Sequence, residues 1–347
     1  MLNIIFSNSI FRQNITGRVR FRQAVWLWYN QAMETVYARE IASRQGAEKL
    51  VLVASRRTDM PAFYTEELIR GLREGIFHPA GLMQPVRELR FTPEEIHSVG
   101  LWSQDFSEWL KARHRLVSGS AAPRDTRTGS SYKFWYRFTI LPDDPVIKPK
   151  APPVSVQLEQ AARLLELDGP GTVTLCVDPL LYYRKKGTRE WTPGCTDESA
   201  CKIFQGACRL GLKEITLSFI DYYKKVERRA ARSGIEFMYP DLSREAGRQA
   251  AAELVRPLAE ASRRTGIAIR SCCESFPGEP LLLPGACVDG RKLNRLFGPG
   301  ASEKQDRGQR KKQGCLCTLS VDVGRYIEHG TWSHHCFHDC PQCYARY

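Results

Sequence analysis

Short apolar stretches recur along the chain and alternate with segments whose apolar residues repeat at helical spacing. The apolar stretches predict six strands, over residues 49–54, 96–102, 132–140, 171–177, 214–220 and 266–271. The helical spacing predicts helices from about residue 65 and over 106–115, 154–167 and 244–265. Strands that alternate with helices are typical of parallel βαβ units, so we expect an α/β fold, a partial or complete parallel (β/α) barrel.

Polar residues follow nearly every predicted strand. They are Arg56, Arg57 and Asp59, then Ser103 and Gln104, Asp178, Ser218 and Asp221, and Glu274. In a parallel barrel these positions share the face on which active sites are built. We therefore expect a catalytic site lined by Arg56, Arg57, Asp59, Asp178 and Glu274. Asp59 and Asp178 could instead cap helices.

The two ends of the chain differ from its middle. Residues 1–48 are basic, rich in Arg and Gln, and end in a predicted helix from Arg22 to Arg44. This N-terminal extension could dock nucleic acid or form a peripheral helix. Residues 49–297 are the predicted barrel domain, and residues 298–347 form a basic loop and a Cys-rich tail that complete the same domain.

Composition and charge narrow the class of protein. The chain has 347 residues, of which 42% are hydrophobic and 26% charged, as in ordinary globular proteins. Its net charge of +13 makes nucleic acid, a phosphorylated ligand or an acidic partner plausible, although a solvated basic surface would also explain it. The N-terminus lacks the features of a signal peptide, and no run of about 18 apolar residues occurs, so we expect a cytoplasmic protein with no membrane partner.

The cysteines are unevenly distributed. Of twelve in the chain, eight lie between Cys272 and Cys343. In a reducing compartment, clustered thiolates indicate a metal site rather than a disulfide framework.

Cys336, Cys340 and Cys343 have the spacing C-x3-C-x2-C. A loop of this length can give one thiolate to each of three irons of a [4Fe–4S] cluster, leaving the fourth iron open. The spacing resembles that of the radical S-adenosylmethionine superfamily. This resemblance implies S-adenosylmethionine on the open iron, an electron donor such as a ferredoxin or flavodoxin, and a 5′-deoxyadenosyl radical. The aromatic residue usual before the third cysteine is replaced by Gln342, and the loop follows the last strand rather than the first.

Zinc is the alternative for the tail, because His334, His335 and His338 lie beside the three cysteines. A second cysteine set lies upstream and consists of Cys272, Cys287, Cys315 and Cys317. It could hold a second iron–sulfur cluster or a zinc ion, or these could be ordinary buried thiols. Cys273 is expected to be the spare member of its pair.

Several motifs occur in order: Ser-Arg-Arg-Thr-Asp from Ser55, Asp178-Pro179, Cys-Cys-Glu from Cys272, Cys315-Leu-Cys317 and Cys-Pro-Gln-Cys-Tyr from Cys340. In these motifs the chain resembles the bacterial family known as domain of unknown function 1848, from about residue 51 to its end. The resemblance implies a radical-S-adenosylmethionine-like fold and cofactor without naming a substrate.

Three functions follow as hypotheses. The first is a radical S-adenosylmethionine enzyme that acts on an unknown substrate. The second is a zinc-binding, nucleic-acid-associated protein, which the positive charge and the tail histidines favour. The third is an iron–sulfur electron-transfer protein without radical chemistry, which would have no use for the polar residues after the strands.

Overall fold

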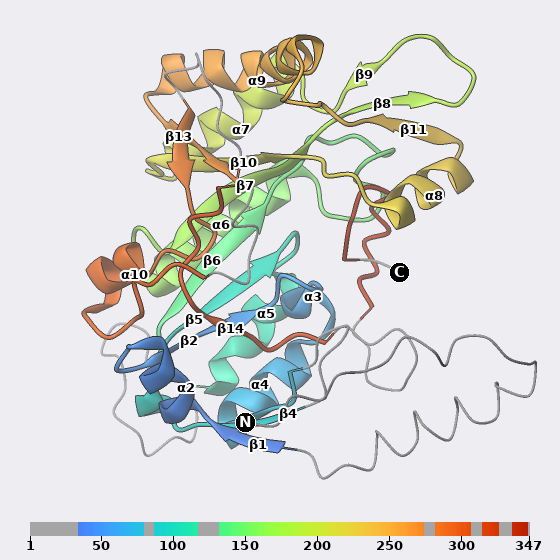
Figure 1. Cartoon of the computed structure of the whole chain (residues 1–347). Coiled ribbons are helices and arrows are strands. Elements are labelled where there is room, and N and C mark those ends of the chain that lie inside the picture. Colours follow the sequence, from blue (N-terminus) through green and yellow to red (C-terminus); the bar gives the residue numbers. More distant parts are fainter. Residues whose placement is uncertain are drawn as a thin grey trace, which may run out of the picture.

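A computed structural model describes residues 34–79, 87–116, 132–273, 282–306, 314–325 and 335–345. Its centre is an eight-stranded sheet with the order β13-β12-β10-β7-β6-β5-β2-β14, in which every neighbouring pair of strands is parallel (Figure 1). The strands are β2 (Leu50–Ala54), β5 (Ile96–Ser103), β6 (Phe134–Thr139), β7 (Val173–Leu180), β10 (Glu214–Phe219), β12 (Ala268–Cys272), β13 (Leu282–Gly285) and β14 (Val321–Asp322).

The six predicted strands correspond to β2, β5, β6, β7, β10 and β12, so the α/β fold with a large parallel sheet is confirmed. The two strands that the sequence did not reveal, β13 and β14, are the edges of the sheet. Within the described part of the chain no pairing joins these two edges.

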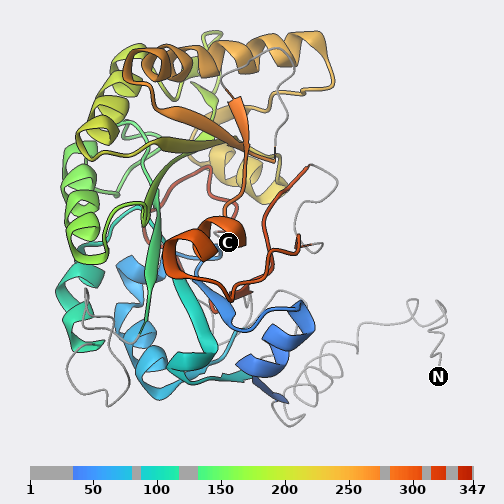
Figure 2. The ribbon, with the colours of Figure 1, turned by 90° about the vertical axis from the view of Figure 1, so that its left-hand side faces the viewer.

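Helices cover the outer face of the curved sheet (Figure 2). They include α4 (Thr65–Glu74), α5 (Ser107–Ala112), α6 (Val154–Asp168), α7 (Asp197–Arg209) and α9 (Glu245–Thr265), and they confirm the predicted helices. Short α3 (Met60–Phe63) precedes α4, and α8 (Lys224–Arg232) follows β10. Helix α10 (Gly290–Phe297) lies on the opposite, concave side of the sheet.

Alternation along the strands separates the two faces of the sheet. In β2, Leu50 and Leu52 belong to the main core under the outer helices, whereas Val51 and Val53 pack in a second cluster with Leu293 of α10. Successive strand residues point to opposite faces, so the same rule places polar residues of other strands on the concave side. This concave side is where the cavities described below are found.

Two small sheets flank the large one. The first contains β1 (Glu34–Tyr37), β4 (Arg87–Arg90) and β3 (Ile76–Phe77), and the second contains β11 (Ile235–Met238), β8 (Tyr182–Lys185) and β9 (Thr192–Pro193). No helix in the described ranges is long and apolar enough to cross a membrane.

The helix predicted over residues 22–44 is wrong at residues 34–37, which form β1 and pair with β4, and it is confirmed over residues 38–44, which are helical. The helix here is α2 (Ala38–Gln45) alone, and residues 1–33 lie outside the described ranges. Pairing with a distant strand overrides local helical propensity at this point. Ala38 and Ala42 are fully buried in the main core, so this part of the predicted N-terminal extension packs against the large sheet.

Candidate functional site

A cavity of about 250 Å³ lies at the carboxyl ends of the parallel strands. Its wall includes Arg56, Asp59 and Asp178, which follow or end β2 and β7. It also includes eight cysteines: Cys272, Cys273, Cys287, Cys315, Cys317, Cys336, Cys340 and Cys343. The two cysteine sets, which the sequence placed apart, therefore line one cavity together with the predicted polar strand ends.

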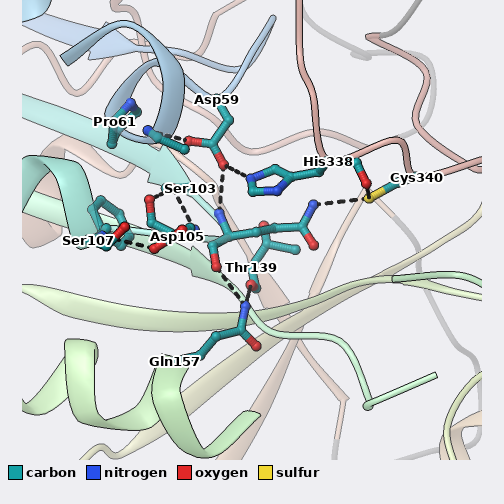
Figure 3. A network of polar contacts seen from close by, with 12 residues as sticks. Asp59, Pro61, Ser103, Asp105, Ser107, Thr139, Gln157, His338 and Cys340 are labelled. Carbon is teal, nitrogen blue, oxygen red and sulfur yellow. Dashed lines mark hydrogen bonds and ion pairs between the residues drawn. The ribbon is translucent and has the colours of Figure 1, made fainter. Parts of the chain in front are cut away.

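The tail is attached to the first strand–helix connection by a buried contact. His338 Nε2 lies 2.8 Å from Asp59 Oδ2, and the two residues are 3% and 7% exposed (Figure 3). The Asp59 carboxylate also accepts hydrogen bonds from the backbone amides of Gln104 at 2.9 Å and Ala62 at 3.1 Å. Asp59 is thus the N-cap of α3, as one alternative predicted, and it also positions the cysteine tail.

Gln104 connects this contact to a thiol. Its side-chain Nε2 donates to Cys340 Sγ at 3.4 Å. Its backbone carbonyl oxygen accepts from Gln157 Nε2 of α6 at 2.8 Å (Figure 3). The sequence placed Gln104 among the polar residues after strands but gave it no role. Its position after β5 was the signal that could have assigned one.

Four further hydrogen bonds fix the end of the tail. Arg229 of α8 donates from Nε to the Pro341 carbonyl at 3.0 Å, and its guanidinium also bonds to the Cys343 carbonyl. Gln342, which stands where an aromatic residue was expected, donates to the Ile147 carbonyl at 2.7 Å. The Tyr344 hydroxyl donates to the Arg56 carbonyl at 2.8 Å. The backbone of this segment is held on several sides of the cavity.

The upstream thiols form a contiguous group. Cys272 Sγ lies 3.1 Å from Cys287 Sγ and 3.8 Å from Cys273 Sγ, and the Cys287 amide donates to Cys317 Sγ at 3.2 Å. Cys273, predicted to be spare, is therefore part of this group. Among the residues that the structure describes, no three His, Cys, Asp or Glu side chains are arranged around one point as ligands of a metal ion. The thiols contact one another instead.

Positive charge lies beside the upstream thiols. Arg56 Nε is 3.5 Å from Asp322 Oδ2 and also interacts electrostatically with Cys317 and Cys287. Arg137 of β6 places Nη2 4.0 Å from Cys287 Sγ. Hydrogen bonds from Cys287 and Cys315 lower the pKa of Cys317, whereas contacts with Cys272 and Cys317 raise the pKa of Cys287. This group can therefore hold negative charge.

The surroundings of the tail thiols, in contrast, disfavour negative charge. Burial raises the pKa of Cys340 to about 12 and that of Cys336 further, and the Asp59 carboxylate adds to both effects. These two thiols stay protonated unless a cation is bound, because a metal ion supplies the charge that makes a buried thiolate favourable.

A family model described as a domain of unknown function (DUF1848) matches residues 51–345. The chain belongs to the DUF1848 family. Searches of curated proteins and of solved structures returned no match. The matched region of this DUF1848 protein runs from β2 through the cysteine tail, so it contains every residue of the cavity wall.

Only some of the predicted catalytic residues of the DUF1848 protein line the cysteine cavity. Arg56, Asp59 and Asp178 line the cavity, and Asp178 accepts a hydrogen bond from Ser218. Arg57 donates from Nη1 to the Gly324 carbonyl at 2.8 Å, which anchors the segment after β14. Glu274 and His334 lie outside the described residues.

Replacing Arg229 with Lys should loosen the tail of this DUF1848 protein. A lysine has no planar fork with which to bond two carbonyl groups, so the backbone of residues 341–345 would open more often. We expect hydrogen exchange of these amides to become about tenfold faster, as measured by mass spectrometry. The matched control is Arg228→Lys, because Arg228 is the exposed neighbour on the same helix. Equal exchange in the two variants would contradict the role assigned to Arg229.

Proposed function

We propose that this DUF1848 protein binds a [4Fe–4S] cluster through Cys336, Cys340 and Cys343 and acts as a radical S-adenosylmethionine enzyme on an unknown substrate. The observation that carries the proposal is the shared cavity. Three tail thiols meet the polar ends of parallel strands there, where α/β enzymes build their active sites.

The tail fits the proposed group in donor type and electrostatics. Three thiols line one cavity, and their spacing along the sequence, C-x3-C-x2-C, suits three irons of one cluster. The raised pKa values of Cys336 and Cys340 mean that these thiols ionise only beside a cation. When bound with one iron open to S-adenosylmethionine, such a cluster supplies one-electron reduction and a 5′-deoxyadenosyl radical.

The residues of this chain would position the cysteine tail and orient the bound molecule. Asp59 and Gln104 hold His338 and the Cys340 thiol, so they fix the tail rather than react. Arg56 and the Asp178–Ser218 pair offer charged and polar groups in the same wall for S-adenosylmethionine or substrate. The upstream cysteines would hold a second cluster or zinc, with Arg56 and Arg137 offsetting its negative charge.

One contact favours a zinc site as the second candidate. His338 is hydrogen bonded to Asp59, and a carboxylate–histidine pair is the usual support of a zinc ligand. A Cys3His zinc centre in the tail would suit the nucleic-acid-associated alternative. An iron–sulfur electron carrier remains the third candidate.

Anaerobic purification followed by metal and activity assays distinguishes the three candidate functions. We expect a brown protein that contains iron and sulfide and, after reduction by dithionite or a reduced flavodoxin, converts S-adenosylmethionine to 5′-deoxyadenosine and methionine. A colourless protein with stoichiometric zinc would overturn the proposal in favour of the zinc site. A brown protein that leaves S-adenosylmethionine intact would leave only the electron carrier.

A further inference from the structure

A second cavity, of about 470 Å³, lies on the concave side of the sheet. Gly171, Thr172 and Glu214 in its wall precede or begin β7 and β10, so it extends toward the amino ends of the strands. The cysteine cavity is at the opposite ends, and Cys287 lines both. Of the side chains in this wall, the proposed function uses only Cys287 and Arg137.

Two buried donors in its wall have no acceptor. Trp135 Nε1 and Arg137 Nε make no hydrogen bond to any of the residues that the structure describes, although the two residues are only 6% and 5% exposed. Both lie on the concave face of β6 because they are two positions apart. An unsatisfied buried N–H group is costly, and natural proteins rarely leave one without a protein, water or ligand acceptor.

Positively charged side chains outnumber negatively charged ones in the wall of this cavity. Glu214 is already paired with Lys292 at 2.7 Å and with Arg270, and these cations lower its pKa to about 2 despite its burial. Arg137 and Arg295 form no ion pair with a carboxylate among the described residues. The cavity therefore has surplus positive charge and surplus donors, and both are satisfied by an anionic acceptor.

We propose that this cavity binds a small acidic molecule through an oxyanion, a carboxylate or a phosphate, which accepts hydrogen bonds from Arg137 Nε and Trp135 Nε1. Guanidinium groups bind such anions with charge-assisted hydrogen bonds. The volume suits a metabolite rather than a polymer segment. The bound molecule lies beside Cys287, next to the cysteine cavity, and Arg137 faces both, since its Nη2 lies 4.0 Å from Cys287 Sγ.

Isothermal titration calorimetry on the full chain as purified tests the proposal. The probes are inorganic phosphate and citrate, which separate phosphate from carboxylate ligands, with glycerol as the neutral comparison. We expect saturable binding of at least one anion and none of glycerol. Arg137→Gln should weaken this binding about tenfold or more, and Trp135→Phe, which removes only the indole donor and keeps an aromatic ring, several-fold. Arg163→Gln makes the same change in net charge on the exposed face of α6 and should leave the affinity unchanged.

Circular dichroism shows whether each variant folds. If Arg137→Gln does not fold, Trp135→Phe decides the outcome. Absence of anion binding at millimolar concentration, or equal affinity in wild type and the folded cavity variants, would overturn the proposal and leave ordered water as the partner of the two donors.

Discussion

Replacing Cys336, Cys340 and Cys343 together with Ala should remove about four irons and four sulfides per chain and abolish cleavage of S-adenosylmethionine. The three thiols are the only protein ligands that the proposal gives to the catalytic cluster, and all three line one cavity. Without them no protein atom would hold the irons, so the loss should be complete rather than partial. Iron and sulfide assays, with electron paramagnetic resonance of the reduced protein, measure the effect.

Two matched variants make this result specific. Cys201→Ala with Cys208→Ala removes thiols on α7 that lie outside the cysteine cavity, and it should keep the full iron content. Replacing Cys272, Cys287, Cys315 and Cys317 should remove only the metal of the upstream group and leave the tail cluster detectable. Full iron content in the tail variant would contradict the assignment, and zinc loss in its place would support the zinc alternative.

Six strands of the large parallel sheet could be predicted because the signal for each strand is local. Leu50 to Ala54 is an uninterrupted apolar run, and strands buried on both faces in a parallel sheet have this pattern. The polar residues after these strands were correctly expected to share one end of the sheet, as Arg56, Asp59 and Asp178 do.

The rest of the architecture depended on contacts between distant segments. Strand β1 exists because Glu34–Tyr37 pairs with β4, more than fifty residues later, and β14 is only two residues long. Neither strand can be predicted from the local sequence, because pairing with a distant strand easily overrides local propensity.

The candidate site likewise has one part that the sequence predicts and another that depends on contacts between distant segments. The C-x3-C-x2-C spacing predicted the tail group from the sequence. No spacing could predict that Cys273 joins the upstream thiols, or that His338, 279 residues from Asp59, bonds to it. A side chain assigned to catalysis from its position after a strand is instead placed to hold the tail.

That assignment predicts a large loss of stability in Asp59→Ala. The carboxylate accepts hydrogen bonds from His338 and from the amides of Gln104 and Ala62, and its removal leaves one buried and two partly buried donors unpaired. Hydrogen bonds to a buried charged group are each worth about 1.5–3 kcal/mol, although they do not add fully. We expect the free energy of unfolding to fall by about 3–5 kcal/mol, as measured by urea denaturation.

The control is Asp241→Ala, which removes a surface carboxylate that pairs only with nearby exposed groups and should change the free energy of unfolding by less than about 0.5 kcal/mol. Asp59→Asn refines the test, because an amide oxygen can still accept from the Ala62 amide while the charge facing His338 is lost. It should be intermediate in stability and should lose iron from the tail faster than wild type. If Asp59→Ala were as stable as the control but had lost S-adenosylmethionine cleavage, Asp59 would act on the bound molecule itself. Its position between α3, β5 and His338 argues against that outcome, since its two carboxylate oxygens already accept three hydrogen bonds from these parts of the chain.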